Sequence, residues 1–343
     1  MRALITGGSG YFGSLLVNNL CSKGWECRVL DINKYNGESS VEFIEGDIRN
    51  LEIVEKACSD IDVVFHNVAQ VPLAKDKNLF KSVNILGTEN ILKASSSSNV
   101  NRVIYTSSSA VYGVPQTNPV VENMVPKPME SYGRAKYEGE EICQNYISDS
   151  LDIIIIRPRT ILGHGRLGIF QILFEWIREG KNIPVLGKGD NIYQFVHADD
   201  LANAIILASN PKVKSGIYNC GSEKFGSMKE TLQNLCEYAN TGSRVKSVPF
   251  TPAVIGMKLT SFLGLSPLGS YHALMYGRSM YFDNSKAIKE LGWKPKYSND
   301  EMFEESYNWY CENREQIVKG NNSGSVHQSK VNQGILKILK YLI

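Results

Sequence analysis

The sequence predicts an α/β protein built on a doubly wound, Rossmann-type parallel sheet with a smaller, mostly C-terminal substrate lobe. Three observations predict it. Strand-like apolar runs alternate with helix-like amphipathic segments over the first 160 residues. A glycine-rich string joins the first strand to the first helix. Residues 153–156 are four consecutive isoleucines, as expected of a strand that is buried on both faces.

The spacing of apolar residues sets the order of elements in the first half of the chain. We expect strands at 2–5, 27–30, 41–45, 63–66, 102–107 and 153–156, and helices at 11–23, 51–58, 81–95 and 131–148. Gly24 follows the first helix at a position where helices commonly end. Residues 1–160, with 190–220 returning to them, are therefore expected to form a dinucleotide-binding domain.

The pattern is looser after residue 160, where we expect helices at 168–179, 199–209 and 227–238 and a strand at 216–220. Residues 161–189 and 221–319 are assigned to the substrate-binding lobe. The apolar stretch 251–268 is expected to be a helix and loop over the substrate, or else a helix packed on its own lobe. Residues 320–343 are expected to be a flexible linker and an apolar tail, which packs on the protein or makes a weak contact with a membrane surface or a partner.

Composition excludes several classes of function. The net charge is +2 and no long run of Lys or Arg occurs, so a nucleic-acid partner is not expected. The seven cysteines are scattered without metal-ligand spacing, which indicates reduced thiols, a cytoplasmic location and no metal site. No stretch of about 20 uncharged apolar residues occurs, so no spanning helix is expected. A strand begins at once, so we expect no leader peptide.

The string TGGSGYFG at 6–13 has the form of a dinucleotide loop. Gly7, Gly10 and Gly13 let backbone amides and a helix N-terminus approach a pyrophosphate. Asp31 ends the second strand, where a carboxylate accepts hydrogen bonds from the ribose hydroxyls and repels a 2′-phosphate. The expected cofactor is therefore NAD rather than NADP. Asp47 and Ile48 follow the third strand and contact adenine, or else Asp47 caps a helix.

Tyr132 and Lys136 lie four residues apart on a predicted helix and so share one face. A nearby ammonium favours the phenolate form of the tyrosine. Tyr132 can then exchange a proton with a substrate hydroxyl while a hydride moves to or from the nicotinamide. The serines after Thr106 end a strand and offer a hydroxyl to the same substrate oxygen. Redox chemistry at a carbinol or carbonyl carbon follows from this combination.

Over roughly residues 1–315 the chain resembles the extended short-chain dehydrogenase/reductase family, which contains nucleotide-sugar epimerases and 3β-hydroxysteroid dehydrogenases. The strings that carry the resemblance are TGGSGYFG at 6–13, HNVAQ at 66–70, VNILGT at 83–88, YTSSSAVYG at 105–113, YGRAK at 132–136, RPRTILGHG at 157–165, FVHADDLANAI at 195–205 and FDNSKAIKELGW at 282–293. The resemblance also implies a homodimer formed through the helices at 81–95 and 131–148.

The resemblance assigns roles to single residues. It makes Tyr132 the acid/base, Lys136 its partner and Ser108 the catalytic hydroxyl. The cofactor positions that it implies, beside the glycines, Asp31 and the Tyr–Lys pair, are Tyr11, Phe12, Asp47, Ile48, Val68, Ala69, Asn84, Thr106 and Pro158. The substrate positions are Ser108, Ser109, Thr160, Arg166 and Tyr193.

Departures from the family pattern limit the reactions that the chain is expected to catalyse. Dehydratases of the family carry Asp-Glu directly after the catalytic hydroxyl, whereas this chain has Ser109 and Ala110, so 4,6-dehydration is not expected. Tyr193 stands near the place where the epimerases have an arginine that binds the diphosphate. Arg166, like the arginines at 157 and 159, is an alternative diphosphate partner or a structural residue.

The leading prediction is an NAD-dependent epimerase or oxidoreductase that acts on a nucleotide-activated sugar through a keto intermediate. The alternative is a 3β-hydroxysterol or lipid-alcohol dehydrogenase, or an epimerase of a lipid-linked sugar, in which 251–268 lines an apolar pocket. A third class, a dinucleotide sensor without catalysis, is disfavoured because both Tyr132 and Lys136 are present.

Overall fold

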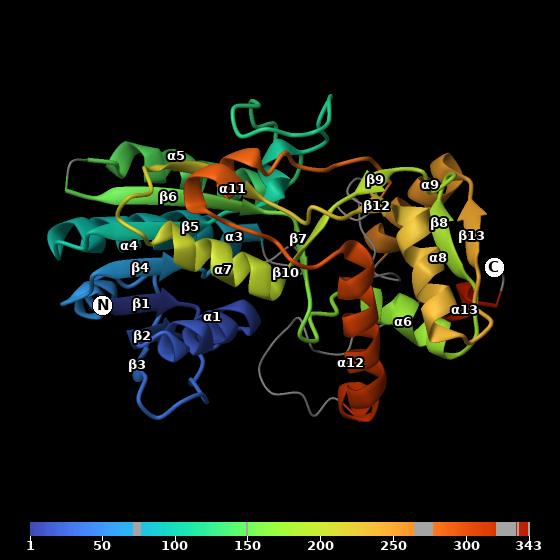
Figure 1. The fold of residues 1–343 in the computed structure, drawn as a ribbon, viewed down its shortest axis with the longest axis horizontal. Coiled ribbons are helices and arrows are strands. Elements are labelled where there is room, and N and C mark those ends of the chain that lie inside the picture. Colours follow the sequence, from blue (N-terminus) through green and yellow to red (C-terminus); the bar gives the residue numbers. More distant parts are fainter. Residues whose placement is uncertain (71–76, 149, 264–276, 320–333, 335, 342–343) are drawn as a thin grey trace.

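The computed structural model describes residues 1–70, 77–148, 150–263, 277–319, 334 and 336–341. A seven-stranded parallel sheet forms its centre, in the order β11-β6-β5-β4-β1-β2-β3 (Figure 1). The strands are β1 (Arg2–Thr6), β2 (Glu26–Asp31), β3 (Glu42–Glu45), β4 (Val63–His66), β5 (Arg102–Thr106), β6 (Asp152–Pro158) and β11 (Gly216–Cys220). The predicted Rossmann-type sheet is confirmed.

Helices cover both faces of this sheet (Figure 1). One face carries α1 (Tyr11–Ser22), α7 (Ala198–Ala208) and α11 (Ser285–Leu291), and the other carries α2 (Leu51–Cys58), α4 (Gly87–Ser97) and α5 (Ser131–Tyr146). Each face has its own apolar core. Ile154 and Ile156 belong to one core and Ile153 and Ile155 to the other, which explains why all four positions of this strand are apolar.

The parallel register brings the carboxyl ends of the strands to one edge. Thr6 at the end of β1 is level with Leu30 of β2 and with His66 of β4. Thr106 at the end of β5 is level with Ile156 of β6. Loops that leave these strand ends therefore converge, and an open parallel sheet binds its ligands at this edge.

The helix predicted at 81–95 is more complex in the structure. It consists of α3 (Lys77–Lys81), the π-helical turn η1 (Ser82–Leu86) and α4. In η1 the Asn84 side chain accepts from the amide of Gln70 at 2.7 Å and donates to the carbonyl of Gln70 at 3.2 Å. These bonds join residues that are 14 positions apart in the chain, so they are tertiary contacts. The spacing of apolar residues reports only local structure, and it therefore did not predict this π-helical turn.

The smaller lobe has its own apolar core, formed mainly by α6 (Phe170–Arg178), α8 (Met228–Ala239) and α12 (Asn299–Lys319). Its short strand pairs are β8 (Ile183–Leu186) with β13 (Val245–Val248), and β9 (Ile192–Tyr193) with β12 (Gly226–Ser227). Strands of two to four residues show no readable period, and the sequence did not predict them.

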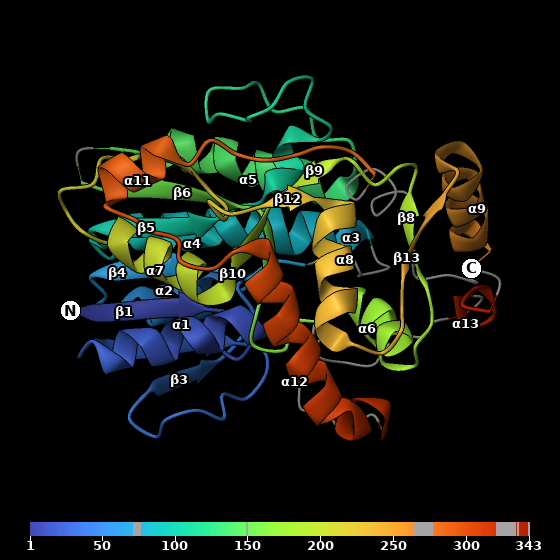
Figure 2. The same ribbon diagram turned by 45° about the vertical axis from the view of Figure 1, so that its right-hand side comes forward.

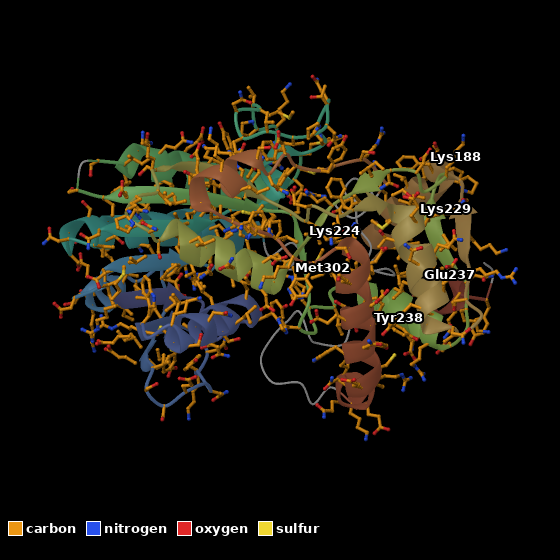
Figure 3. The ribbon with its side chains drawn as sticks, in the orientation of Figure 1. Lys188, Lys224, Lys229, Glu237, Tyr238 and Met302 are labelled. Carbon is orange, nitrogen blue, oxygen red and sulfur yellow. The ribbon has the colours of Figure 1, made fainter. Side chains whose placement is uncertain are left out.

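Two hydrogen bonds join α8 and α12 in the smaller lobe. Asn308 of α12 donates to the hydroxyl of Tyr238 at 2.7 Å, and Asn234 of α8 donates to the carboxylate of Asp300 at 2.8 Å. Met302 of α12 is fully buried in the same lobe (Figure 3). A further short pair, the parallel strands β7 (Thr160–Leu162) and β10 (Phe195–His197), leads from the sheet to this lobe. The assignment of residues 161–189 and 221–319 to a substrate-binding lobe remains a proposal.

The apolar stretch at 251–268 is described as far as residue 263. It forms α9 (Phe250–Phe262), which lies at the far end of the smaller lobe beside β13 (Figure 2). Ile255, Leu259 and Leu263 are exposed. Residues 264–268 lie outside the described part of the chain. In the described part, no helix is long and apolar enough to cross a membrane.

The described part of the apolar tail forms a short helix, α13 (Leu336–Leu339). Leu336 is buried in the core of the smaller lobe, and Lys340 forms an ion pair with Glu179 at 2.5 Å. Tyr341 is exposed and its ring lies 4.8 Å from the ammonium of Lys181. These residues of the tail therefore pack on the protein, which is one of the alternatives that the sequence left open. The predicted linker at 320–333 lies outside the described residues.

Candidate active site

A cleft of about 660 Å³ lies at the carboxyl edge of the sheet and extends to the beginning of α6. The predicted site residues that line it are Gly7, Gly10, Tyr11, Phe12, Gly13, Asp31, Asp47, Ile48, Val68, Ala69, Thr106, Ser108, Ser109, Tyr132, Lys136, Pro158, Thr160 and Arg166. Residues more than 150 positions apart in the chain thus meet in one cleft, as the parallel register requires.

The glycine loop between β1 and α1 leaves no room for side chains. Gly7 has a left-handed φ of +74°, which favours glycine. A Cβ on Gly13 would lie 2.0 Å from the carbonyl oxygen of Gly7, so the first turn of α1 packs directly on the loop backbone. Gly10 caps α1 without a side chain. The N-terminus of α1 is therefore open to a phosphate group, which fits a dinucleotide.

Asp31 lines the same cleft from the end of β2 and is 8% exposed. Its carboxylate accepts from the amide of Ser9 at 3.0 Å and from the amide of Asn33 at 2.9 Å. These two bonds hold the carboxylate beside the glycine loop, where it fits the hydroxyls of an adenosine ribose. Asp47 is at the rim, where its ion pair with Arg49 lowers the pKa of the carboxyl.

The first turn of α5 presents Tyr132 to the cleft. Glu130 caps this helix by accepting from the amides of Tyr132 at 2.8 Å and Gly133 at 2.6 Å, which fixes the direction of the turn. Burial raises the pKa of the Tyr132 phenol, and the hydrogen bond with Ser108 opposes this rise. Ser108 also accepts from the amide of Ala110 at 3.1 Å, so its position is fixed.

Lys136 lies one turn further along α5 and is 2% exposed. Its ammonium donates to the carbonyl of Thr106 at 2.7 Å and lies 4.6 Å from the ring centre of Tyr105. Burial lowers the pKa of Lys136 to about 8. The lysine is therefore mostly protonated at neutral pH.

A buried ion pair supports α5 from behind. The Glu140 carboxylate is bonded to Nη2 of Arg157 at 2.5 Å and to Nε at 2.8 Å, and both side chains are almost fully buried. Ser107 also donates to Glu140, and Arg157 donates to the hydroxyl of Tyr112 at 2.6 Å. Arg157 is thus a structural residue, and the alternative that it binds a diphosphate is wrong.

Two predicted site residues do not line the cleft. Asn84 is buried, and both polar atoms of its side chain bond to the backbone of Gln70, so it supports the wall instead of contacting a ligand. Tyr193 is 1% exposed because β9 pairs with β12, which places its hydroxyl behind Thr160, 2.9 Å from Oγ1. A direct substrate contact by Tyr193 does not agree with this placement.

Arg159 and Arg166 are also among the residues that line the cleft. Arg166 was predicted, and its guanidinium lies 5.5 Å from the ring centre of Tyr11. Arg159 also lines the cleft and donates to Oγ of Ser109 at 3.0 Å. The sequence indicated Arg159 only together with the arginines at 157 and 166, because residue type alone did not separate the three. The position of Arg159 directly before the predicted substrate residue Thr160 is the sequence feature that separates it from the other two.

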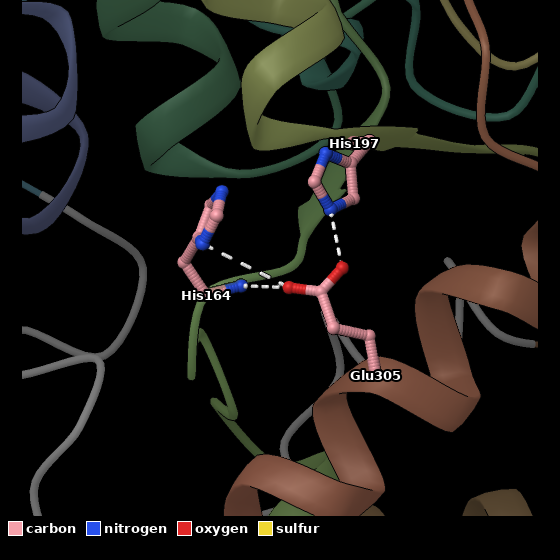
Figure 4. A group of neighbouring side chains, drawn as sticks. All are labelled: His164, His197 and Glu305. Atoms are coloured by element: carbon pink, nitrogen blue, oxygen red, sulfur yellow. Dashed lines mark hydrogen bonds and ion pairs between the residues drawn. The ribbon is translucent and has the colours of Figure 1, made fainter.

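A cluster beside the cleft joins the loop after β7 to β10 and α12 (Figure 4). His197 lies 2.8 Å from the Glu305 carboxylate, and the amide of His164 donates to that carboxylate at 3.0 Å. His164 also pairs with Asp199 at 2.9 Å. Burial opposes ionisation of Glu305, but these contacts lower its pKa to about 2. The cluster connects the smaller lobe to the loop whose Gly163 carbonyl accepts from Tyr11.

Known proteins resemble the whole chain. The model of the NAD dependent epimerase/dehydratase family matches residues 3–221. The uncharacterised protein y4nG of Sinorhizobium fredii is 53% identical over 343 residues, which are 99% of this chain and 86% of that protein. A putative UDP-glucose 4-epimerase of Methanocaldococcus jannaschii is 29% identical over 325 residues, which are 90% of this chain and 98% of that protein.

The fold is also that of a solved enzyme. The crystal structure of UDP-glucose 4-epimerase with UDP-glucose from Thermotoga maritima matches with a TM-score of 0.75 at 23% identity, covering 92% of this chain and 100% of that one. The match of the family model over more than half of the chain, together with the glycine loop and the Tyr132–Lys136 pair, leads to one conclusion. The chain belongs to the NAD dependent epimerase/dehydratase family and is an NAD-dependent enzyme.

Proposed function

We propose that the protein is an epimerase of a nucleotide-activated sugar, with a uridine diphosphate hexose as the first candidate. One observation carries the proposal: Tyr132, Ser108 and Lys136 line the same cleft as the glycine loop and Asp31. The similarity to the putative UDP-glucose 4-epimerase of Methanocaldococcus jannaschii supports it. The residues of the glycine loop and Asp31 would hold NAD, as their geometry fits.

When bound, NAD supplies a reversible hydride acceptor. Tyr132 is placed to take the proton from a sugar hydroxyl and to return it to the same oxygen once the carbon that bears it has inverted. Ser108 is hydrogen-bonded to Tyr132, so its hydroxyl can hold the same sugar oxygen during both transfers. The ammonium of Lys136, fixed by the Thr106 carbonyl, favours the phenolate form of Tyr132.

Elimination of water from the sugar would need a further acid and base beside Ser108. Ser109 and Ala110 occupy those positions; the hydroxyl of Ser109 accepts from Arg159, and Ala110 is buried. Among the described residues that line the cleft, the carboxylates are Asp31 and Asp47, and both lie toward the adenosine end. This arrangement supports epimerisation rather than 4,6-dehydration.

The alternative of a sterol or lipid-alcohol substrate has lost its main support. That alternative required residues 251–268 to line an apolar pocket over the site. The described part of this stretch, α9, lies at the far end of the smaller lobe and does not line the cleft (Figure 2). We therefore retain the sugar nucleotide as the proposed substrate.

The test is turnover of UDP-glucose and UDP-galactose by the purified protein, with product configuration and NADH absorbance measured together. An epimerase forms the other sugar without net NADH, whereas a dehydrogenase accumulates NADH. The Tyr132→Phe variant should lose about 10²- to 10⁴-fold in turnover and still bind NAD. Tyr146→Phe, on the same helix but away from the cleft, is the matched control and should keep wild-type turnover. Near-normal activity of Tyr132→Phe would refute the mechanism.

We also propose a homodimer that forms through the helices around 77–97 and 131–146, and a cytoplasmic site of action. Family similarity supports the dimer, and the seven free cysteines support a reducing compartment. Light scattering coupled to gel filtration tests the first proposal, and fractionation of the source cells tests the second.

A membrane contact by the tail is tested by liposome co-sedimentation with and without residues 320–343, where unchanged partitioning would exclude it.

A further inference from the structure

Two histidines and a glutamate from three separate elements form one group, the His-His-Glu cluster (Figure 4). His164 lies in the loop after β7, His197 ends β10, and Glu305 lies in α12. Each residue offers one ligand atom, and these atoms all lie within 4.8 Å of one another. The ligand atoms of a tetrahedral zinc ion lie about 2.0–2.1 Å from the metal and hence about 3.3 Å from one another. Small movements of the three side chains would therefore bring them onto one ion.

The carboxylate of Glu305 lies between the two imidazole rings. Its Oε2 lies 2.8 Å from Nε2 of His197, and its Oε1 lies 3.8 Å from Nδ1 of His164. The main-chain amide of His164 donates to Oε1 at 3.0 Å, which fixes the carboxylate. A Cβ on Gly163 would lie 2.4 Å from Nε2 of His197, so a side chain there would fill the space beside this nitrogen. Two imidazole nitrogens and a carboxylate oxygen form a donor set that suits Zn²⁺.

Asp199 supplies the outer hydrogen-bond partner that metal-binding histidines usually have. Its Oδ2 lies 2.9 Å from Nε2 of His164, which leaves Nδ1 of that ring for the metal. In His197, Nδ1 accepts from the amide of Asp199 at 3.2 Å, so the proton of the metal-free ring is on Nε2. A metal on Nε2 moves this proton to Nδ1, where Oδ2 of Asp199, 3.8 Å away, can accept it. The ring of Tyr297 stacks on His197 at 3.8 Å between centres and limits its rotation.

We infer that the His-His-Glu cluster is a divalent-metal site, with Zn²⁺ as the preferred ion and water as its fourth ligand. His164 is exposed, so an ion and its water can reach the site from solvent. The sequence predicted no metal site because ligand spacing is read over short stretches, whereas His197 and His164 lie 108 and 141 positions from Glu305. The inference goes beyond the proposed epimerase function and does not depend on it, since metal binding is measured without a sugar nucleotide.

A metal at this cluster connects the smaller lobe to one wall of the cleft. Glu305 belongs to α12 of the smaller lobe, and His164 belongs to the loop whose residues 166–168 line the cleft. The carbonyl of Gly163 in the same loop accepts from the hydroxyl of Tyr11 in α1. The ion would therefore fasten this loop to α12 and act as a structural link rather than as a group that touches the reacting atoms.

The first test titrates ZnCl₂ into the chelator-treated, tag-free full chain in a calorimeter, with CoCl₂ as a spectroscopic probe. We expect one ion per chain with a Kd of about 1 µM or tighter. Co²⁺ should show the weak visible bands of nitrogen and oxygen ligands without the strong near-ultraviolet band of thiolate ligands, which separates the cluster from the seven free cysteines. No binding up to about 100 µM Zn²⁺, or a thiolate band, overturns the inference.

The second test locates the ion. His164→Ala and Glu305→Gln should each weaken Zn²⁺ binding at least about 100-fold, and Asp199→Asn about 10- to 100-fold, because the last change removes an outer contact but no ligand. Glu312→Gln is the matched control: it alters an exposed carboxylate about two turns further along α12 and should leave the Kd unchanged. Wild-type affinity in both His164→Ala and Glu305→Gln overturns the inference.

The third test concerns the link to the cleft. Hydrogen exchange over residues 163–168, followed by mass spectrometry, should slow when Zn²⁺ is added to the wild type and should not change in His164→Ala. Because His164 is exposed, this variant should melt at the wild-type temperature when both proteins are metal-free. Equal exchange with and without Zn²⁺ in the wild type would show that the ion does not fasten the loop, and the structural role would be wrong.

Discussion

Replacing Glu140 by glutamine tests how much the buried ion pair behind α5 contributes to the stability of the fold. Glu140 is fully buried and makes three hydrogen bonds, two from Arg157 and one from Ser107. Glutamine keeps the shape but leaves the Arg157 charge buried without its counter-charge. Loss of one partner from such a pair costs about 3–5 kcal/mol, which is a large share of the stability of an ordinary domain. We expect Glu140→Gln to lower the free energy of unfolding by that amount.

The assay is urea unfolding at pH 7, followed by circular dichroism, on Glu140→Gln, Arg157→Met and the double variant Glu140→Met/Arg157→Met. The double variant should lose less than the sum of the single losses by about 2 kcal/mol or more, because it leaves no unpaired charge. Glu315→Gln is the control, since its exposed pair with Lys319 should contribute no more than about 0.5 kcal/mol. A loss below about 1 kcal/mol in Glu140→Gln, or additive losses in the double variant, would contradict the reasoning.

Three further predictions concern the cofactor loop, the lysine and the acid limit of stability. Gly13→Ala should weaken NAD binding at least about 10-fold or unfold the loop, because its Cβ would lie 2.0 Å from the Gly7 carbonyl; fluorescence titration of NADH measures this. Lys136→Met should lower kcat about 10²-fold and move the rising limb of the pH–rate profile to higher pH, because loss of the ammonium raises the pKa of Tyr132. Burial opposes ionisation of Glu175, but its arginine and tyrosine hydrogen bonds lower its pKa to about 2. Its stabilisation is therefore present above about pH 4.5 and lost as the pH falls toward 2, so the stability gap between wild type and Glu175→Gln in urea unfolding should close over that range.

The order of strands and helices around the cofactor could be predicted because each follows from local physics. The four isoleucines before Arg157 indicate a strand buried on both faces, and the glycines from Gly7 to Gly13 indicate close backbone packing. The smaller lobe could not be read in the same way. Its strands are two to four residues long, and its core comes from helices that meet only in the folded chain. Asn84 shows the same limit, since its partner is the backbone of a loop 14 residues away.

The two arginines after the four isoleucines show most clearly where sequence reasoning stops. Arg157 and Arg159 are two residues apart, both almost fully buried, and equivalent in chemical type. They differ in one respect, which is that Glu140 on α5 lies within reach of Arg157 and no described carboxylate lies within reach of Arg159. That difference depends on how α5 packs against β6, and local sequence does not encode it. The same packing that gives Arg157 a carboxylate partner leaves Arg159 buried against the ring of Tyr193, with hydrogen bonds to Gln194 and Ser109 and no ion pair among the described residues.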